Sequence, residues 1–207
     1  PTLCRSHSVL PNPLPRINTS TSTSEVLDEV LNSVSDREYV LFGGGLSRLK
    51  GFDIVKMLAK ILVRHGILTV VSRANRFYFD KDTGIIYVPR LSYPEYIGLL
   101  KNAKAFLYPS IYEEPLPYAV IEALLAGVPP ITTYVGGIPE ILGRRYPMHI
   151  TDTTWSTLNA IANKLIKSYD DILKYTKHRA EILRNKWQDD KLRDSFITII
   201  KSVVEES

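Results

Sequence analysis

The sequence predicts an α/β domain: a Rossmann-like parallel sheet of about six strands, with helices on both faces and a helical C-terminal extension. Two patterns support this prediction. Short, nearly continuous apolar runs alternate with amphipathic helical segments up to about residue 154, which is typical of parallel strands buried on both faces. Residues 155–204 then show helical periodicity without further strand-like runs.

Each expected strand is a short apolar run bounded by glycine, proline or polar residues. The expected strands are residues 39–42, 67–71, 85–88, 105–108, 130–133 and 148–151. Residues 78–84 lie between the second and third of these runs and end at Gly84, so we expect a turn there.

Helix boundaries follow from capping residues and from the spacing of apolar side chains. Ser24 can cap a short helix over residues 25–31. The helix over residues 52–65 carries its apolar side chains on one face, and Gly66 suits the position just past its end. Further helices are expected over residues 95–102, from 117 or 118 to 127, over 139–142 and, as two or three helices, over 155–204.

The expected organisation has three parts. Residues 1–24, with several prolines and a Ser/Thr-rich run, are predicted to form an extended interdomain linker. Residues 25–154 are predicted to form the sheet domain, and residues 155–207 helices that pack on it. Because the chain begins at Pro1 without a charged-then-apolar leader, we expect a fragment or a processed form.

Composition excludes several classes of protein. Of the 207 residues, 44% are hydrophobic and 23% are charged, which fits a soluble globular chain and not global disorder. One cysteine excludes an internal disulfide framework, and the four histidines lack metal-ligand spacing. The net charge of +4 favours an anionic ligand mildly, but the basic residues are too dispersed to predict nucleic-acid binding.

Three loops with unusual residues follow expected strands: residues 43–51, 109–118 and 134–139. Ligands of open parallel sheets bind at the carboxyl ends of the strands. These three loops are therefore predicted to converge on one ligand site.

The first loop combines glycines with two basic residues. Gly44 and Gly45 let backbone N–H groups approach an anion, and Lys50 can supply a positive charge. The dinucleotide-binding fingerprint fails because Arg48 occupies its third glycine position, and no Gly-Lys-Ser/Thr of a Walker A loop follows. A flexible turn with two solvated basic side chains explains this loop equally well.

The second loop is the most informative feature. Glu114 lies in the loop and Glu122 about one turn into the next helix, so both carboxylates can face one cavity. The N–H groups of Tyr118 and Ala119 would point there from the positive helix end. A carboxylate can accept hydrogen bonds from the paired hydroxyls of a ribose or hexose. By themselves, the two glutamates are explained better as a solvated loop charge and a favourably placed helix N-terminal acid.

Three motifs in register change this balance: Glu-x7-Glu from Glu114 to Glu122, Ala-Gly-x-Pro over residues 126–129, and Gly-Gly-Ile-Pro-Glu over residues 136–140. In this combination the chain resembles the C-terminal, donor-binding domain of the retaining glycosyltransferases of family 4. The resemblance covers residues 9–145 and implies one half of the two-domain GT-B fold.

The resemblance also implies roles for the matched residues. Glu122 would hold the ribose hydroxyls and Glu114 the hydroxyls of the donor sugar. Lys50 and the amides at the helix start would hold the diphosphate, and residues 90–92 would contact the base. Catalytic roles are expected for Lys50, Glu114 and Arg48. Donor binding is expected for Gly44, Gly45, Arg90, Ser92, Leu116, Pro117, Tyr118, Ala119 and Glu122.

Two features of the chain depart from the family pattern. Gly45 stands where the family usually has an arginine, five residues before the lysine, and Arg48 is the substitute considered. Pro115-Leu116-Pro117 stands in place of the family's usual Gly-aromatic-Gly, and both prolines lack an N–H that a phosphate or hydroxyl could use. Pro115 is a familiar variant at its position, whereas Pro117 is the more important departure.

The resemblance implies retaining transfer of a hexosyl group from a nucleotide-diphosphate sugar, with no metal and no cofactor. The expected partners are the donor, an N-terminal acceptor domain that this chain lacks, and a lipid-linked acceptor. The expected location is cytoplasmic, at the membrane periphery if the acceptor is lipid-linked. Two alternatives stay open: a nucleotide-sugar-binding module with little or no activity, and a nucleotide-sugar epimerase, for which no suitable catalytic histidine is evident.

Overall fold

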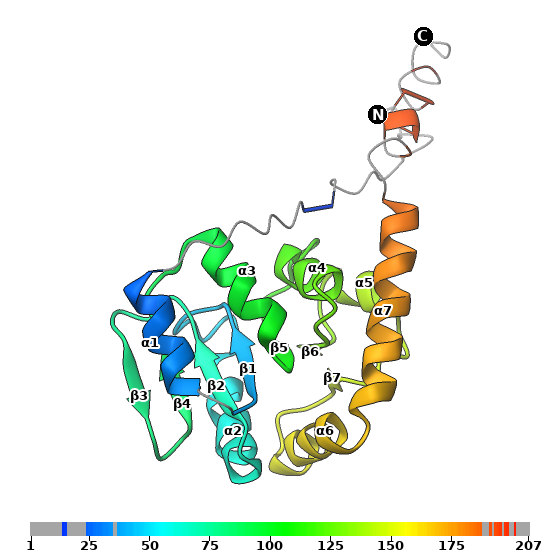
Figure 1. Cartoon of the computed structure of the whole chain (residues 1–207). Coiled ribbons are helices and arrows are strands. Elements are labelled where there is room, and N and C mark those ends of the chain that lie inside the picture. Colours follow the sequence, from blue (N-terminus) through cyan, green and yellow to red (C-terminus); the bar gives the residue numbers. More distant parts are fainter. Residues whose placement is uncertain are drawn as a thin grey trace, which may run out of the picture.

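A seven-stranded sheet in the order β3-β4-β2-β1-β5-β6-β7 forms the centre of the molecule (Figure 1). The computed structural model describes residues 14–15, 24–34, 37–187, 191, 193–195, 197–198 and 201. All neighbouring strands are parallel except β3, which runs antiparallel to β4. The predicted α/β class with a mostly parallel sheet is therefore confirmed.

The strands are close to those expected from the sequence. They are β1 Tyr39–Phe42, β2 Leu68–Val71, β3 Tyr78–Asp80, β4 Ile85–Tyr87, β5 Ala105–Tyr108, β6 Pro130–Thr133 and β7 His149–Ile150. Every residue of β1, β2 and β5 is buried, as expected for strands covered on both faces.

Strand β3 is the exception, because a turn was predicted over this segment. It pairs with β4, and the rings of Tyr78 and Tyr87 stack across the pair with centroids 6.1 Å apart. Cross-strand aromatic pairs stabilise antiparallel strands. The prediction was wrong for residues 78–80 because the polar residues after this short run suggest only a turn.

The helices are α1 Glu25–Val34, α2 Phe52–Leu62, a 3₁₀ turn η1 Val63–His65, α3 Tyr93–Asn102, α4 Tyr118–Leu125, α5 Ile138–Leu142, α6 Trp155–Lys167 and α7 Tyr169–Lys186. Helix α3 begins two residues before the predicted start, because Glu95 accepts hydrogen bonds from the Ser92 N–H (2.8 Å) and hydroxyl (2.6 Å). Beyond residue 187 the structure describes only residues 191, 193–195, 197–198 and 201, which are helical as predicted. The rest of that segment and most of the predicted linker fall outside the described residues.

Helices cover the sheet on both faces. Helices α2 and α6 pack against each other on one side, and α3 and α4 lie on the other (Figure 1). Helix α7 runs along the end of the sheet and packs against α4 and α5. Within the described part of the chain, no helix has the length and apolarity needed to cross a membrane.

Strand β1 lies at the point where the strand order reverses. Its neighbours are β2 and β5, and the chain leaves β1 through α2 on one face but reaches β5 through α3 on the other. Ligand crevices of open α/β sheets form at such switch points, outside the carboxyl ends of the strands. In this fold, that point lies between the loops that follow β1 and β5.

Gly51 fixes the distance between these two loops. Its φ is 83°, and a β-carbon there would overlap the carbonyl group of Pro109. Gly66 has a similar φ of 77°, but a β-carbon there would meet open space. Substitutions at the two glycines therefore distinguish the cost of backbone strain, which both positions share, from the cost of steric overlap, which only Gly51 adds.

We expect Gly66→Ala to lower the free energy of unfolding by about 1 kcal/mol, from backbone strain alone. Gly51→Ala should lower it by about 2–4 kcal/mol, because overpacking is added to the same strain. Urea denaturation of both variants checks this. Equal losses would contradict the close contact between Gly51 and Pro109.

Candidate functional site

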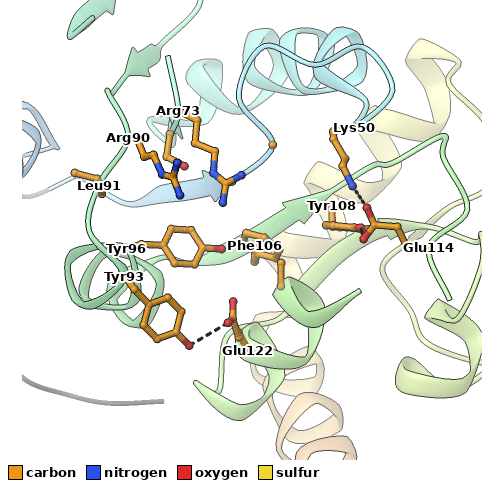
Figure 2. A pocket seen from close by; sticks show the side chains of 14 residues that line it. Lys50, Arg73, Arg90, Leu91, Tyr93, Tyr96, Phe106, Tyr108, Glu114 and Glu122 are labelled. Atoms are coloured by element: carbon orange, nitrogen blue, oxygen red, sulfur yellow. Dashed lines mark hydrogen bonds and ion pairs between the residues drawn. The ribbon is translucent and has the colours of Figure 1, made fainter. Parts of the chain in front are cut away.

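A cavity of about 430 Å³ opens at the switch point (Figure 2). Its walls come from the loops after β1, β2, β4 and β5 and from helices α3 and α4. The charged residues that line it are Lys50, Arg73, Arg90, Glu114 and Glu122. Three cations and two carboxylates suit a ligand that carries both negative charge and hydroxyl groups.

Glu114 is held at one wall of the cavity. One of its carboxylate oxygens forms an ion pair with the Lys50 ammonium, and the other accepts a hydrogen bond of 2.6 Å from the Tyr108 hydroxyl (Figure 2). Burial raises the pKa of Tyr108 to about 12, so this hydroxyl keeps its proton and donates at neutral pH. The Glu114 side chain is therefore oriented before any ligand arrives.

The backbone brings these two side chains together. The carbonyl oxygen of Leu49 accepts hydrogen bonds from the N–H of Ile111 (3.0 Å) and from the Ser110 hydroxyl (3.3 Å). The loop after β1 is thereby joined to the loop after β5. Lys50 follows Leu49 directly, so its ammonium lies within reach of Glu114.

Glu122 occupies the opposite wall, on α4. Its carboxylate accepts a hydrogen bond of 3.0 Å from the Tyr93 hydroxyl at the start of α3 (Figure 2). Burial raises the pKa of Glu122, and the Tyr93 hydrogen bond opposes part of that rise. Burial and the Glu122 charge together raise the pKa of Tyr93 to about 12.

The loop over residues 134–139 supports the site from behind. β-Carbons at Gly136 and Gly137 would overlap the backbone of Glu114 and Pro115, and the Gly137 N–H donates to the Glu114 carbonyl oxygen at 2.9 Å. This third loop is not part of the cavity lining, although convergence of all three loops on the ligand was expected. Its glycines instead let it pack directly against the Glu114 loop.

The structure brings half of the predicted site residues together and leaves the others outside the lining. The predicted residues in the lining are Gly44, Lys50, Arg90, Glu114, Ala119 and Glu122. The others are Gly45, Arg48, Ser92, Leu116, Pro117 and Tyr118.

Two of the residues outside the lining have other contacts. The Arg48 side chain is 86% exposed, and its Nε donates to Asp53 at 2.8 Å. Ser92 forms the N-terminal cap of α3 through its hydrogen bonds to Glu95. Arg48 therefore offers its charge to α2 and not to the cavity.

Sequence reasoning missed several residues of the lining, among them Arg73, Tyr93, Tyr96 and Tyr108. Arg73 follows a predicted strand almost directly, so its place at the carboxyl edge could have been noticed. Tyr93 and Tyr96 share one face of α3, but a helix start predicted at residue 95 hid that spacing.

The lining offers no obvious metal site. Throughout the described residues, no group of three or more His, Cys, Asp or Glu side chains is placed to hold a metal ion. The charged partners available to a ligand are the basic side chains and the two carboxylates.

Comparison with known families gives one match, to the model of Glycosyl transferases group 1, over residues 79–186, just over half of the chain. An uncharacterized glycosyltransferase of Methanocaldococcus jannaschii is 25% identical over 150 residues, which cover 65% of this chain and 38% of that protein. The chain therefore spans well under half the length of this relative.

Solved structures share the fold at low identity. The Anabaena protein Alr3699/HepE in complex with UDP-glucose has a TM-score of 0.67 at 16% identity, over 91% of this chain and 56% of that one. Sucrose-phosphate synthase from Thermosynechococcus elongatus has a TM-score of 0.66 at 16% identity, over 89% and 50%. These neighbours are GT-B glycosyltransferases, and the fold of this chain corresponds to half of theirs.

We expect Tyr93→Phe to raise the pKa of Glu122 further, because a hydrogen bond to a carboxylate favours its charged form. When the pKa of a carboxyl is higher in the folded than in the unfolded state, the folded state binds the proton more tightly. The resulting contribution to the free energy of unfolding is present at low pH and is lost as the pH rises through the folded-state pKa. NMR titration of labelled glutamate carboxyls, assigned with Glu122→Gln, measures the change. Tyr96→Phe is the control, and an equal rise in that variant would contradict a specific role for Tyr93.

Proposed function

Because the chain belongs to the glycosyl transferases group 1, we propose that the cavity at the carboxyl ends of β1 and β5 binds a nucleotide-diphosphate sugar. In this proposal the chain is the C-terminal, donor-binding domain of a family 4 enzyme. The complete enzyme transfers a hexosyl group with retention of configuration, so that the new bond forms on the face the leaving group departs from. It needs no metal or cofactor.

One observation carries this proposal: Lys50, Glu114, Ala119 and Glu122 line a single cavity. Lys50 follows β1, Glu114 follows β5, and Ala119 and Glu122 lie on α4, so three parts of the chain contribute to one cavity. A nucleotide sugar has an anionic diphosphate between two hydroxyl-bearing rings, which matches cations placed between two carboxylates. The UDP-glucose complex of HepE supports the same class of ligand.

Each end of the ligand has its own carboxylate in this arrangement. Glu122 accepts hydrogen bonds from the ribose hydroxyls, and Arg90 and Leu91, in the loop after β4, contact the base. Glu114 contacts the hydroxyls of the donor sugar at the far wall. When the donor binds, the diphosphate competes with Glu114 for the Lys50 ammonium, so the existing ion pair rearranges.

Lys50 stabilises the leaving group in this mechanism. Negative charge develops on the diphosphate as the sugar–phosphate bond breaks, and a nearby ammonium lowers the energy of that state. Helix α4 begins at Tyr118, so the positive end of its dipole adds to the same effect at Ala119. The protein thus contributes positioning and charge stabilisation.

The acceptor binds elsewhere in the enzyme. Since the neighbours are about twice as long as the part this chain matches, we place the acceptor-binding half outside the chain. The proposed acceptor is lipid-linked, and the proposed location is the cytoplasm, at the membrane periphery. Measuring transfer to lipid and soluble acceptors with the complete protein tests this part.

A binding module without transfer is the second candidate, favoured by two departures in the donor loops. Arg48 pairs with Asp53 outside the cavity, and Pro117 has no N–H at the start of α4. Both changes weaken stabilisation of the leaving group more than binding of the nucleotide. Radiolabelled sugar transfer by the complete protein would exclude this candidate.

We expect the chain to bind at least one of UDP-, GDP- and ADP-glucose in calorimetric titrations. Glu122→Gln should weaken that binding about 10–100-fold, because charge-assisted hydrogen bonds to the ribose are lost. Glu113→Gln is the matched control, since Glu113 is exposed and outside the lining. Failure of all three sugars to bind, or equal binding by Glu122→Gln, would refute the proposed function.

The affinity should also depend on pH through Glu122. Its pKa is raised by burial, so the carboxylate that accepts the ribose hydrogen bonds is lost on acidification earlier than for an ordinary glutamate. The diphosphate of a nucleotide sugar is a diester and does not titrate near neutral pH. Affinity should therefore fall as pH falls from 7 to 5, and this slope should flatten in Glu122→Gln; an unchanged slope would exclude Glu122 as its source.

A further inference from the structure

Arg73 has an unusual backbone conformation at the edge of the cavity. It follows β2, and its φ of 67° makes it the only non-glycine residue with positive φ in the described part of the chain. A left-handed backbone is unfavourable for a residue with a β-carbon and persists only where the surroundings enforce it. Such strain is concentrated at functional sites.

Gly45 allows the loop after β1 to approach Arg73 closely. A β-carbon added to Gly45 would lie 3.2 Å from the Arg73 carbonyl oxygen and 3.3 Å from the Arg73 β-carbon. These distances are tighter than ordinary van der Waals contact, so a larger residue at position 45 would press on Arg73. The glycine in the first loop therefore lets the β1 loop pack against the backbone of Arg73.

The Arg73 guanidinium extends into the cavity without a partner. Figure 2 shows it between Arg90 and Lys50, facing the space above Phe106. It forms no hydrogen bond or ion pair with any residue that the structure describes. Lys50, in contrast, is already paired with Glu114.

The neighbouring positive charges are unfavourable until an anion arrives. Burial and then the charge of Arg73 lower the pKa of Lys50, which places the two cations close enough to repel each other. An anion between them would remove this repulsion and give Arg73 a partner. The planar fork of a guanidinium matches two oxygens of one phosphate.

We propose that Arg73 binds the diphosphate of the donor and, with Lys50, holds the leaving group; this rests on the proposed function. Arg73 then supplies a second cation beside Lys50. Position 45 is a glycine and Arg48 pairs with Asp53, so neither residue brings that charge into the cavity. Arg73 follows β2, and Glu114 follows β5. These two strands lie on opposite sides of β1. The diphosphate is thus held from both sides of the β1 loop.

The test compares the chain with its Arg73→Gly and Arg73→Asn variants. Glycine and asparagine both tolerate left-handed backbone, so neither variant should melt at a lower temperature. Affinity for the best-bound nucleoside diphosphate among UDP, GDP and ADP should fall about 10–100-fold in calorimetry. Binding of the corresponding nucleoside, followed by NMR chemical shifts, should not change.

Arg76→Ala is the matched control, because it removes the same charge from an exposed position outside the cavity lining. It should leave both affinities unchanged. Unaltered diphosphate binding in the two Arg73 variants, with weakened binding in Glu122→Gln, would overturn the role of Arg73 and leave the proposed function standing. Equal weakening for nucleoside and diphosphate would also overturn it. If the unsubstituted chain binds none of the three nucleoside diphosphates, both proposals fail.

Discussion

The site depends on the joining of two loops that are about 60 residues apart in the chain. The carbonyl oxygen of Leu49 accepts hydrogen bonds from the Ile111 N–H and the Ser110 hydroxyl, so the loop after β1 cannot move independently of the loop after β5. Gly51, in contact with Pro109, permits this closeness. The pairing of Lys50 with Glu114 is a consequence of this backbone contact and of the parallel pairing of β1 with β5.

The charged side chains of the cavity differ in whether they have partners within the protein. Glu114 is neutralised by Lys50 and held by Tyr108, and Glu122 is held by Tyr93, so both carboxylates have partners. Arg73 has none among the described residues, which leaves an excess of positive charge in the middle of the cavity. A cavity whose carboxylates have partners and whose central guanidinium has none suits an anionic group flanked by hydroxyls.

Much of the fold could be predicted because apolar runs and capping residues are local features. The strands β1, β5 and β6 have the predicted bounds, since each is a buried run with clear flanking residues. The glutamate pair was found because Glu-x7-Glu stands in register with two further motifs, and this combination carries the family resemblance. Arg73 and Tyr93 were not found. The position of Arg73 just after a predicted strand indicates only the carboxyl edge of the sheet. Its approach to Lys50, and that of Tyr93 to Glu122, depends on strand order and crossover direction, which no local pattern encodes. Arg48 shows the converse. It is only two residues from Lys50 in the sequence, but its side chain pairs with Asp53 on α2 and does not line the cavity.

The two outermost strands of the sheet are short. Strand β3 has three residues and β7 has two, so few backbone N–H and C=O groups are exposed along either margin. Long, flat margins recruit strands from other molecules and start aggregation. A sheet that ends in such short strands offers few backbone groups for edge-to-edge pairing with another molecule. Short edges of this kind disfavour polymerisation through backbone hydrogen bonds at high protein concentration.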